Sequence, residues 1–116
     1  MDVKNYVLGE WVAGDGVEIE HENAITGDII GTCSSKGLDF GAILDYGRTK
    51  GSTALRKMTF QQRGEMIKSL ALYLHKRKEM FYDLSKATGA TRIDSWIDIE
   101  GGIGNLFANA SLRKQF

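Results

Sequence analysis

The only thiol in the chain belongs to Cys33, and a thiol can act as a nucleophile in catalysis. Such a role requires a nearby base or a cationic environment that lowers the thiol pKa. Cys33 stands at the end of Ile29–Cys33, a segment whose apolar and β-branched residues predict a short strand. We therefore interpret Cys33 as a structural residue of that strand.

A histidine lies among glutamates in the run Glu18–Glu22, which raises the question of a metal site. Along Val17–Glu22, glutamates alternate with other residues at the period of two that a half-exposed strand requires. This alternation sends His21 to the face opposite the glutamates, so the imidazole and the carboxylates are poorly placed to share one zinc ion. A solvated strand is the preferred interpretation.

Three further patterns also favour structural roles. The basic run His75–Lys78 could contact phosphate, but it stands between two apolar helical stripes and predicts a solvated helix face. Gly101–Gly104 lacks the spacing of a dinucleotide fingerprint and follows a helical pattern. Asp98 and Glu100 are two residues apart, so on a helix their carboxylates diverge and cannot readily share a proton. The sequence thus predicts no catalytic, cofactor-binding or metal-binding residue in this chain.

The composition of the 116 residues, 42% hydrophobic and 26% charged, is typical of one globular domain. Fifteen basic residues balance fifteen acidic ones, which leaves no positive field to attract nucleic acid or an anionic membrane. Residues 1–12 lack the apolar stretch of a secretory signal, and no apolar run approaches the length of a membrane span. With a single cysteine, these features predict a cytoplasmic protein that has no nucleic-acid or membrane partner.

Residues 1–36 are rich in glycine and β-branched residues, and they predict short strands separated by turns. The predicted strands are Tyr6–Leu8, Trp11–Ala13, Val17–Glu22 and Ile29–Cys33. The Gly14–Gly16 cluster predicts a hairpin turn, and Thr26–Asp28 predicts the turn that precedes the last strand.

Residues 37–116 have the apolar spacing of helices. The first helix carries the stripe Phe40, Ile43, Leu44 and Gly47. Gly51 ends or loosens this helix. Thr59–Gln62 matches a capping box that begins the second helix. Apolar residues continue to Gly89, which predicts either one long helix or two helices joined near His75–Arg77.

A last helix is predicted to begin between Thr91 and Asp94. Its predicted buried face consists of Trp96, Ile99, Ile103, Leu106, Phe107 and Ala110. The same helix contains Gly101, Gly102 and Gly104, each of which costs about 1 kcal/mol relative to alanine in a helix interior. A close approach to a neighbouring backbone would compensate for this cost, and a break in the helix is the alternative.

Several segments resemble the aldehyde dehydrogenase superfamily. The short strands, then Asn23–Ile30 and a helix led by Arg63, are similar to the start of that family, although Ala24 replaces a proline that is common there. A more specific resemblance covers nearly the whole chain. It is to one subfamily, the dehydrogenase domain of the bifunctional phenylacetic acid degradation protein, in which an aldehyde dehydrogenase is fused to a MaoC-like hydratase. It is carried by Ala54–Gly64, Ala87–Thr91 and Asp94–Gly104.

Members of that family oxidise aldehydes through a cysteine thiolate, hydride transfer to NADP or NAD, and thioester hydrolysis assisted by a glutamate base. The resemblance implies that these groups and the nucleotide-binding crossover lie downstream of the matched region. Residues 1–116 would then form an N-terminal layer without a cofactor site of its own. The basic segment Arg113–Phe116 follows a helical stripe without a terminating device, which predicts a truncated chain.

The sequence therefore predicts an α/β fold, with a hairpin and short strands in residues 1–36 and three or four helices in residues 37–116. This fold would form the outer part of an aldehyde dehydrogenase cofactor-binding domain. One functional hypothesis is an N-terminal fragment, inactive alone, of an NADP-dependent dehydrogenase for a CoA-linked semialdehyde of aromatic or phenylacetate catabolism. The alternatives are a free-standing interaction or oligomerisation module and a small enzyme that uses glutamate or histidine. Exposed apolar surfaces predict self-association or binding to the rest of the dehydrogenase.

Overall fold

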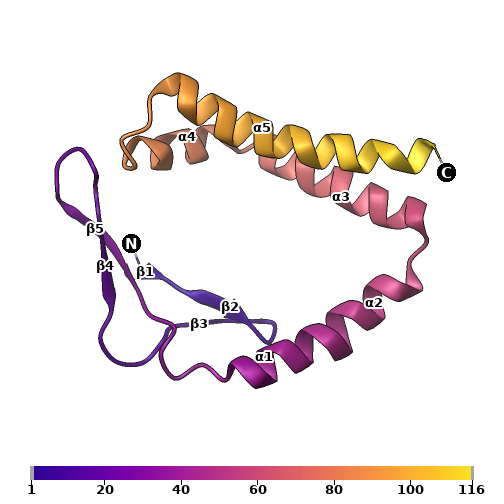
Figure 1. The fold of residues 1–116 in the computed structure, drawn as a ribbon, viewed down its shortest axis with the longest axis horizontal. Helices are drawn as coiled ribbons and strands as arrows, with labels where there is room; N and C mark the ends of the chain where they lie inside the picture. Colours follow the sequence, from indigo (N-terminus) through magenta and orange to yellow (C-terminus); the bar gives the residue numbers. More distant parts are fainter. Residues whose placement is uncertain (1, 116) are drawn as a thin grey trace. The chain divides into compact units, whose positions relative to one another are not determined.

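The strands and helices fall into two units, Met1–Ala54 and Leu55–Phe116, each with its own internal contacts. The structure is a computed structural model and describes residues 2–115 (Figure 1). Short strands precede the helices along the chain, so the fold is mixed α/β, as the sequence predicts.

In the first unit, an antiparallel hairpin pairs β2 (Asn5–Val7) with β3 (Glu10–Val12). Its two-residue turn consists of Leu8 and Gly9, whose φ angles are 54° and 90°. Two successive positive φ angles give the kind of turn whose twist matches that of the flanking strands. The positive φ angles of Leu8 and Gly9 therefore allow β2 and β3 to pair directly on either side of the turn.

The predicted N-terminal hairpin is present, but its turn is Leu8–Gly9 and not the Gly14–Gly16 cluster. The chain passes so near Gly14 that a Cβ atom there would lie 2.2 Å from the Ser34 carbonyl oxygen. The Asp15 N–H donates to the Lys36 carbonyl oxygen at 2.8 Å, which fixes the crossing of the two segments. The glycines are needed because a side chain would separate these segments.

A three-stranded sheet has the order β1 (Asp2–Val3), β5 (Ile29–Cys33) and β4 (Ile19–Glu22). β1 is parallel to β5, and β4 is antiparallel to it. β5 has the predicted bounds. All four residues of β4 are exposed, so the predicted half-burial is wrong. An alternating pattern produces burial only where a second layer covers one face, and the described residues provide no such layer for β4.

The first helix, α1 (Phe40–Tyr46), begins at Asp39, whose carboxylate accepts a hydrogen bond from the Ala42 N–H at 2.9 Å. The helix does not end at Gly51. Its turns widen to π-helical geometry over Gly47–Gly51, and α2 (Ser52–Lys57) continues from there. The prediction of a loosened helix is confirmed, and that of a helix end is wrong.

The second unit contains α3 (Phe60–His75), α4 (Lys78–Lys86), α5 (Arg92–Ser111) and the short 3₁₀ helix η2 (Leu112–Lys114). The predicted capping box is present, because Thr59 and Gln62 exchange hydrogen bonds of 2.8 and 3.1 Å. A second capping box joins Thr91 and Asp94 and begins α5. The alternative with two helices separated near His75–Arg77 is confirmed.

The core of the second unit lies where α3 and α4 pack against α5 (Figure 1). Ala71 of α3 and Ile103 and Ala110 of α5 are buried there. The predicted buried face is wrong for Trp96, which is 56% exposed. Ser95 is buried in its place, because its hydroxyl forms a 2.8 Å hydrogen bond with the hydroxyl of Ser85 on α4.

The glycine that allows a close approach lies in α3, not in α5. A Cβ atom at Gly64 would lie 2.8 Å from Arg113 Cβ and 3.3 Å from the Ala110 carbonyl oxygen. At Gly101, Gly102 and Gly104, an added Cβ atom would have no described neighbour within 4 Å, and α5 is continuous through all three. Both explanations predicted for these glycines, a close approach and a break, are therefore wrong among the described residues.

We expect Gly64→Ala and Gly101→Ala to have opposite effects on the free energy of unfolding. Gly101→Ala should raise it by about 1 kcal/mol, because alanine favours the helix and meets open space. Gly64→Ala should lower it by about 1 to 2 kcal/mol, because the new methyl group forces α3 away from α5. Urea unfolding followed by circular dichroism measures both values. Equal effects of the two substitutions would contradict this packing.

Candidate functional site

The structure brings together two residues that the sequence singled out separately, Cys33 and His21. His21 Nε2 lies 3.0 Å from Cys33 Sγ across the β4–β5 pair. The contact is possible because His21 lies opposite Gly31, which has no side chain to block it. The antiparallel turn between these strands was predictable, but the register that creates the contact was not. The pocket beside Cys33 has a volume of about 70 Å³. Ligand pockets usually exceed about 300 Å³.

The residues 2–115 contain no group of three or more histidine, cysteine, aspartate or glutamate side chains placed to bind a metal ion. None of the described helices has the length and apolar character needed to cross a membrane.

The basic run His75–Lys78 covers the end of α3, the connecting residues Lys76 and Arg77, and the start of α4. His75, Lys76 and Arg77 are exposed, so the predicted solvation is confirmed, although the helix is interrupted there. The Arg77 guanidinium lies 3.6 Å from the centre of the Tyr73 ring. Lys78 Nζ lies 2.7 Å from Glu100 Oε1, and the His75 ring packs edge-on against Phe107. These partners belong to the same unit, so the run helps to hold the helices together.

Glu100 connects α5 to α4 through two side chains. Its Oε1 atom accepts hydrogen bonds from Lys78 Nζ at 2.7 Å and from the Tyr82 hydroxyl at 3.2 Å. The bond from Lys78 lowers the pKa of Glu100 below its ordinary value, although burial opposes this shift. The same bond raises the pKa of Lys78. Burial, and next the bond to Glu100, raise the pKa of Tyr82. Tyr82 is 3% exposed, so this network forms part of the packed α4–α5 interface.

The guanidinium of Arg92 reinforces the same interface. Its carbon Cζ lies 3.7 Å from the centre of the Tyr82 ring, and Nη2 lies 3.7 Å from Glu79 Oε2. The second contact is exposed and contributes little, whereas the ring contact covers a buried aromatic side chain. Together these contacts hold α4 at a fixed position along the first half of α5.

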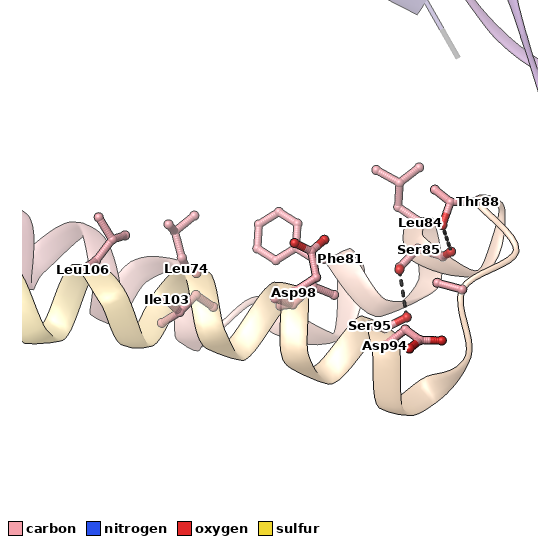
Figure 2. A pocket seen from close by; sticks show the side chains of 13 residues that line it. Leu74, Phe81, Leu84, Ser85, Thr88, Asp94, Ser95, Asp98, Ile103 and Leu106 are labelled. Carbon is pink, nitrogen blue, oxygen red and sulfur yellow. Dashed lines mark hydrogen bonds between the residues drawn. The ribbon is translucent and has the colours of Figure 1, made fainter.

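The second unit contains an apolar groove of about 580 Å³. We define the α4–α5 groove by its thirteen lining residues, which are Leu74, Phe81, Leu84, Ser85, Thr88, Ala90, Asp94, Ser95, Asp98, Ile99, Gly102, Ile103 and Leu106. Figure 2 shows the side chains of Leu74, Phe81, Leu84 and Leu106 along one side of this groove. Its volume is in the range of ligand pockets, and its lining is mainly aliphatic and aromatic.

Polar groups gather at one end of the α4–α5 groove. Ser85 and Ser95 bond to each other, and the Thr88 hydroxyl donates to the Ser85 carbonyl oxygen at 2.7 Å (Figure 2). Asp94 is occupied by the capping box of α5. Asp98 has no hydrogen bond or ion pair with any described residue. The predicted divergence of Asp98 and Glu100 is confirmed, because Glu100 binds Lys78 and Tyr82 while Asp98 lines the groove.

The α4–α5 groove is suited to binding and contains no catalytic pair. None of its lining residues is a cysteine, histidine, lysine or arginine, so it has neither a thiol nor a cationic group. The helical stripe that the sequence predicts as far as Gly89 includes Phe81, Leu84 and Thr88, and such a stripe normally faces a core. Leu84 is instead 52% exposed, because α5 contacts the adjacent face of α4 through Tyr82 and Ser85.

Sequence comparison relates the chain to the aldehyde dehydrogenases. The chain is similar to the 3,4-dehydroadipyl-CoA semialdehyde dehydrogenase of Aromatoleum evansii, with 32% identity over 104 residues. The match covers 89% of this chain and 20% of that enzyme, so the chain spans about a fifth of the length of the curated relative. No protein-family model matches the chain.

We expect Glu100→Gln to remove a pH-dependent part of the stability. The pKa of Glu100 is lower in the folded chain, so its contribution is complete above the unfolded pKa of about 4.3 and disappears as the pH falls through the folded value. The difference in unfolding free energy between the wild type and Glu100→Gln should therefore shrink below about pH 4.3. Urea unfolding across this range measures it. Glu20→Gln, on the exposed strand β4, is the control. A difference that does not change with pH would contradict the role of the carboxylate.

Proposed function

We propose that the chain is an N-terminal portion of a dehydrogenase for a CoA-linked semialdehyde, and that it serves as a structural layer for the rest of that enzyme. The single observation that carries this proposal is the 32% identity to the Aromatoleum evansii enzyme over 89% of the chain. The name of that relative supplies the substrate class, a semialdehyde attached to CoA. NADP as the electron acceptor, a role in phenylacetate catabolism and fusion to a MaoC-like hydratase belong to the same proposal, supported by the sequence resemblance.

Exposed apolar side chains on α4 and α5 support a structural role. Met80, Ile93, Trp96 and Ile97 are each more than half exposed, as is Leu84 in the α4–α5 groove. Apolar surface exposed in this way is unfavourable in water and is typical of an interface. We propose that further polypeptide of the dehydrogenase covers this surface.

The side chains of this chain also suit a supporting role better than a chemical one. Oxidation of an aldehyde through a thioester needs a thiolate nucleophile and a base placed where substrate and nicotinamide meet. The one thiol, Cys33, contacts His21 beside a pocket of about 70 Å³, which is too small for a CoA-linked substrate. We therefore assign oxidation to residues outside this chain and place its cofactor there.

The isolated chain should self-associate, because the exposed apolar residues of α4 and α5 have no cover within the described residues. Size-exclusion chromatography with light scattering should give a dimer or a higher oligomer at high protein concentration. Replacing Trp96 and Ile97 together by Ser should reduce the apparent mass. A clean monomer of the wild-type chain at high concentration would contradict the expected self-association.

A chimera tests the proposed function directly. The region of the Aromatoleum evansii enzyme that matches this chain is replaced by residues of this chain, and NADP reduction is followed with 3,4-dehydroadipyl-CoA semialdehyde as substrate. We expect the chimera to be active, because the replaced layer supports the site without entering the reaction. The same chimera with Cys33→Ser should turn over at an unchanged rate. The 116-residue chain alone should reduce no NADP. Reduction by the isolated chain, or loss of turnover in the Cys33→Ser chimera, would overturn the proposal.

A further inference from the structure

The α4–α5 groove has two properties that restrict its occupant, apolar walls and an acidic rim. The walls are supplied by Leu74, Phe81, Leu84 and Leu106 (Figure 2). The rim carries Asp94 and Asp98, and no lysine or arginine lines the groove. Asp94 is engaged in the capping box, so Asp98 is the carboxylate that is free to bind a partner.

The backbone of the groove excludes an extended strand as the occupant. α3, α4 and α5 form the walls, and the backbone groups inside a helix bond to one another. A docked strand would find no row of free N–H and C=O groups, and its own backbone would stay unpaired in an apolar site. A helix satisfies its backbone internally, so it can enter this groove without that cost.

The length of the groove is also consistent with a helix. Its lining residues on α5 run from Asp94 to Leu106. At 1.5 Å per residue, these positions span about 18 Å, which a helix of about twelve residues would cover. Gly102 lies within this stretch, and an added Cβ atom there would meet nothing within 4 Å. The missing side chain keeps the middle of the groove open.

We propose that the α4–α5 groove binds an amphipathic helix of the remaining dehydrogenase polypeptide, with leucine-type residues facing the groove and one lysine or arginine paired with Asp98. This proposal rests on the proposed function, because the dehydrogenase is the source of the helix. The apolar face of the helix covers the walls, and its basic side chain neutralises the carboxylate that the described residues leave without a partner.

Two matched peptides test the groove with the full 116-residue chain. Both are capped eighteen-residue helices with leucine on one face and alanine elsewhere, one carrying lysine and the other glutamate at the edges of the leucine face. The lysine peptide should bind more tightly than the glutamate peptide. Asp98→Lys should weaken the lysine peptide about tenfold and strengthen the glutamate peptide, since one charge pair changes sign. Fluorescence anisotropy of labelled peptides measures both affinities.

Two further variants separate the groove from general charge effects and from loss of fold. Asp83→Lys makes the same charge change on α4, at a residue that does not line the groove, and should leave both affinities unchanged. Gly102→Leu should fill the groove and abolish binding of both peptides, while circular dichroism shows an intact helix. The proposal is overturned if the lysine peptide does not bind. It is also overturned if neither Asp98→Lys nor Gly102→Leu changes the affinity of that peptide.

The outcome also distinguishes this proposal from the proposed function. If the chimera is active but the peptides do not bind as expected, the proposed function stands and the proposal for the groove is overturned. If the peptides bind in a charge-dependent way but the chimera is inactive, the groove is still a binding site for a helix. In that case the helix does not come from the dehydrogenase, and that part of the proposal is overturned. A dimer that Gly102→Leu dissociates would make a second copy the occupant and would also overturn the proposal.

Discussion

The close contact between α3 and α5 is the constraint on which the rest of the second unit depends. It is possible because small residues lie at the crossing: Gly64 and Ala71 on α3, and Ala110 on α5. Arg113 then spans the end of the contact, where its Nε donates to Glu65 at 2.6 Å and its Nη1 to the Ala110 carbonyl oxygen. The bond from Arg113 lowers the pKa of Glu65. With α5 placed by α3, α4 can dock on the remaining face of α5 and form the groove.

Features that depend on neighbouring residues in the sequence were predictable. The capping box of Thr59 and Gln62 follows from four consecutive residues, and the bounds of Ile29–Cys33 follow from its composition. The separation of Asp98 and Glu100 follows from helix geometry alone. The mixed α/β order of strands and helices was predictable for the same reason.

Features that depend on which segments meet in space were not predictable. Trp96 and Ser95 are adjacent, and which of them is buried depends on the Ser85 hydroxyl of another helix. A glycine within a helix is tolerated where a neighbouring segment packs closely against it, and the sequence does not show which glycine has such a neighbour. In the structure it is Gly64, because Arg113 packs against it. The groove itself arises from apolar stripes that are wider than a single neighbouring helix can cover, so periodicity predicts burial where the structure has an open groove.

The turn of the β2–β3 hairpin contains a residue, Leu8, in an unfavourable backbone conformation. Leu8 adopts a left-handed backbone conformation that disfavours side chains with a Cβ atom by about 1 to 2 kcal/mol. Its side chain is 46% exposed, so burial recovers only part of this cost. Asparagine or glycine would fit this backbone better without altering either strand. The turn between β2 and β3 is therefore less stable than it would be with asparagine or glycine in place of Leu8.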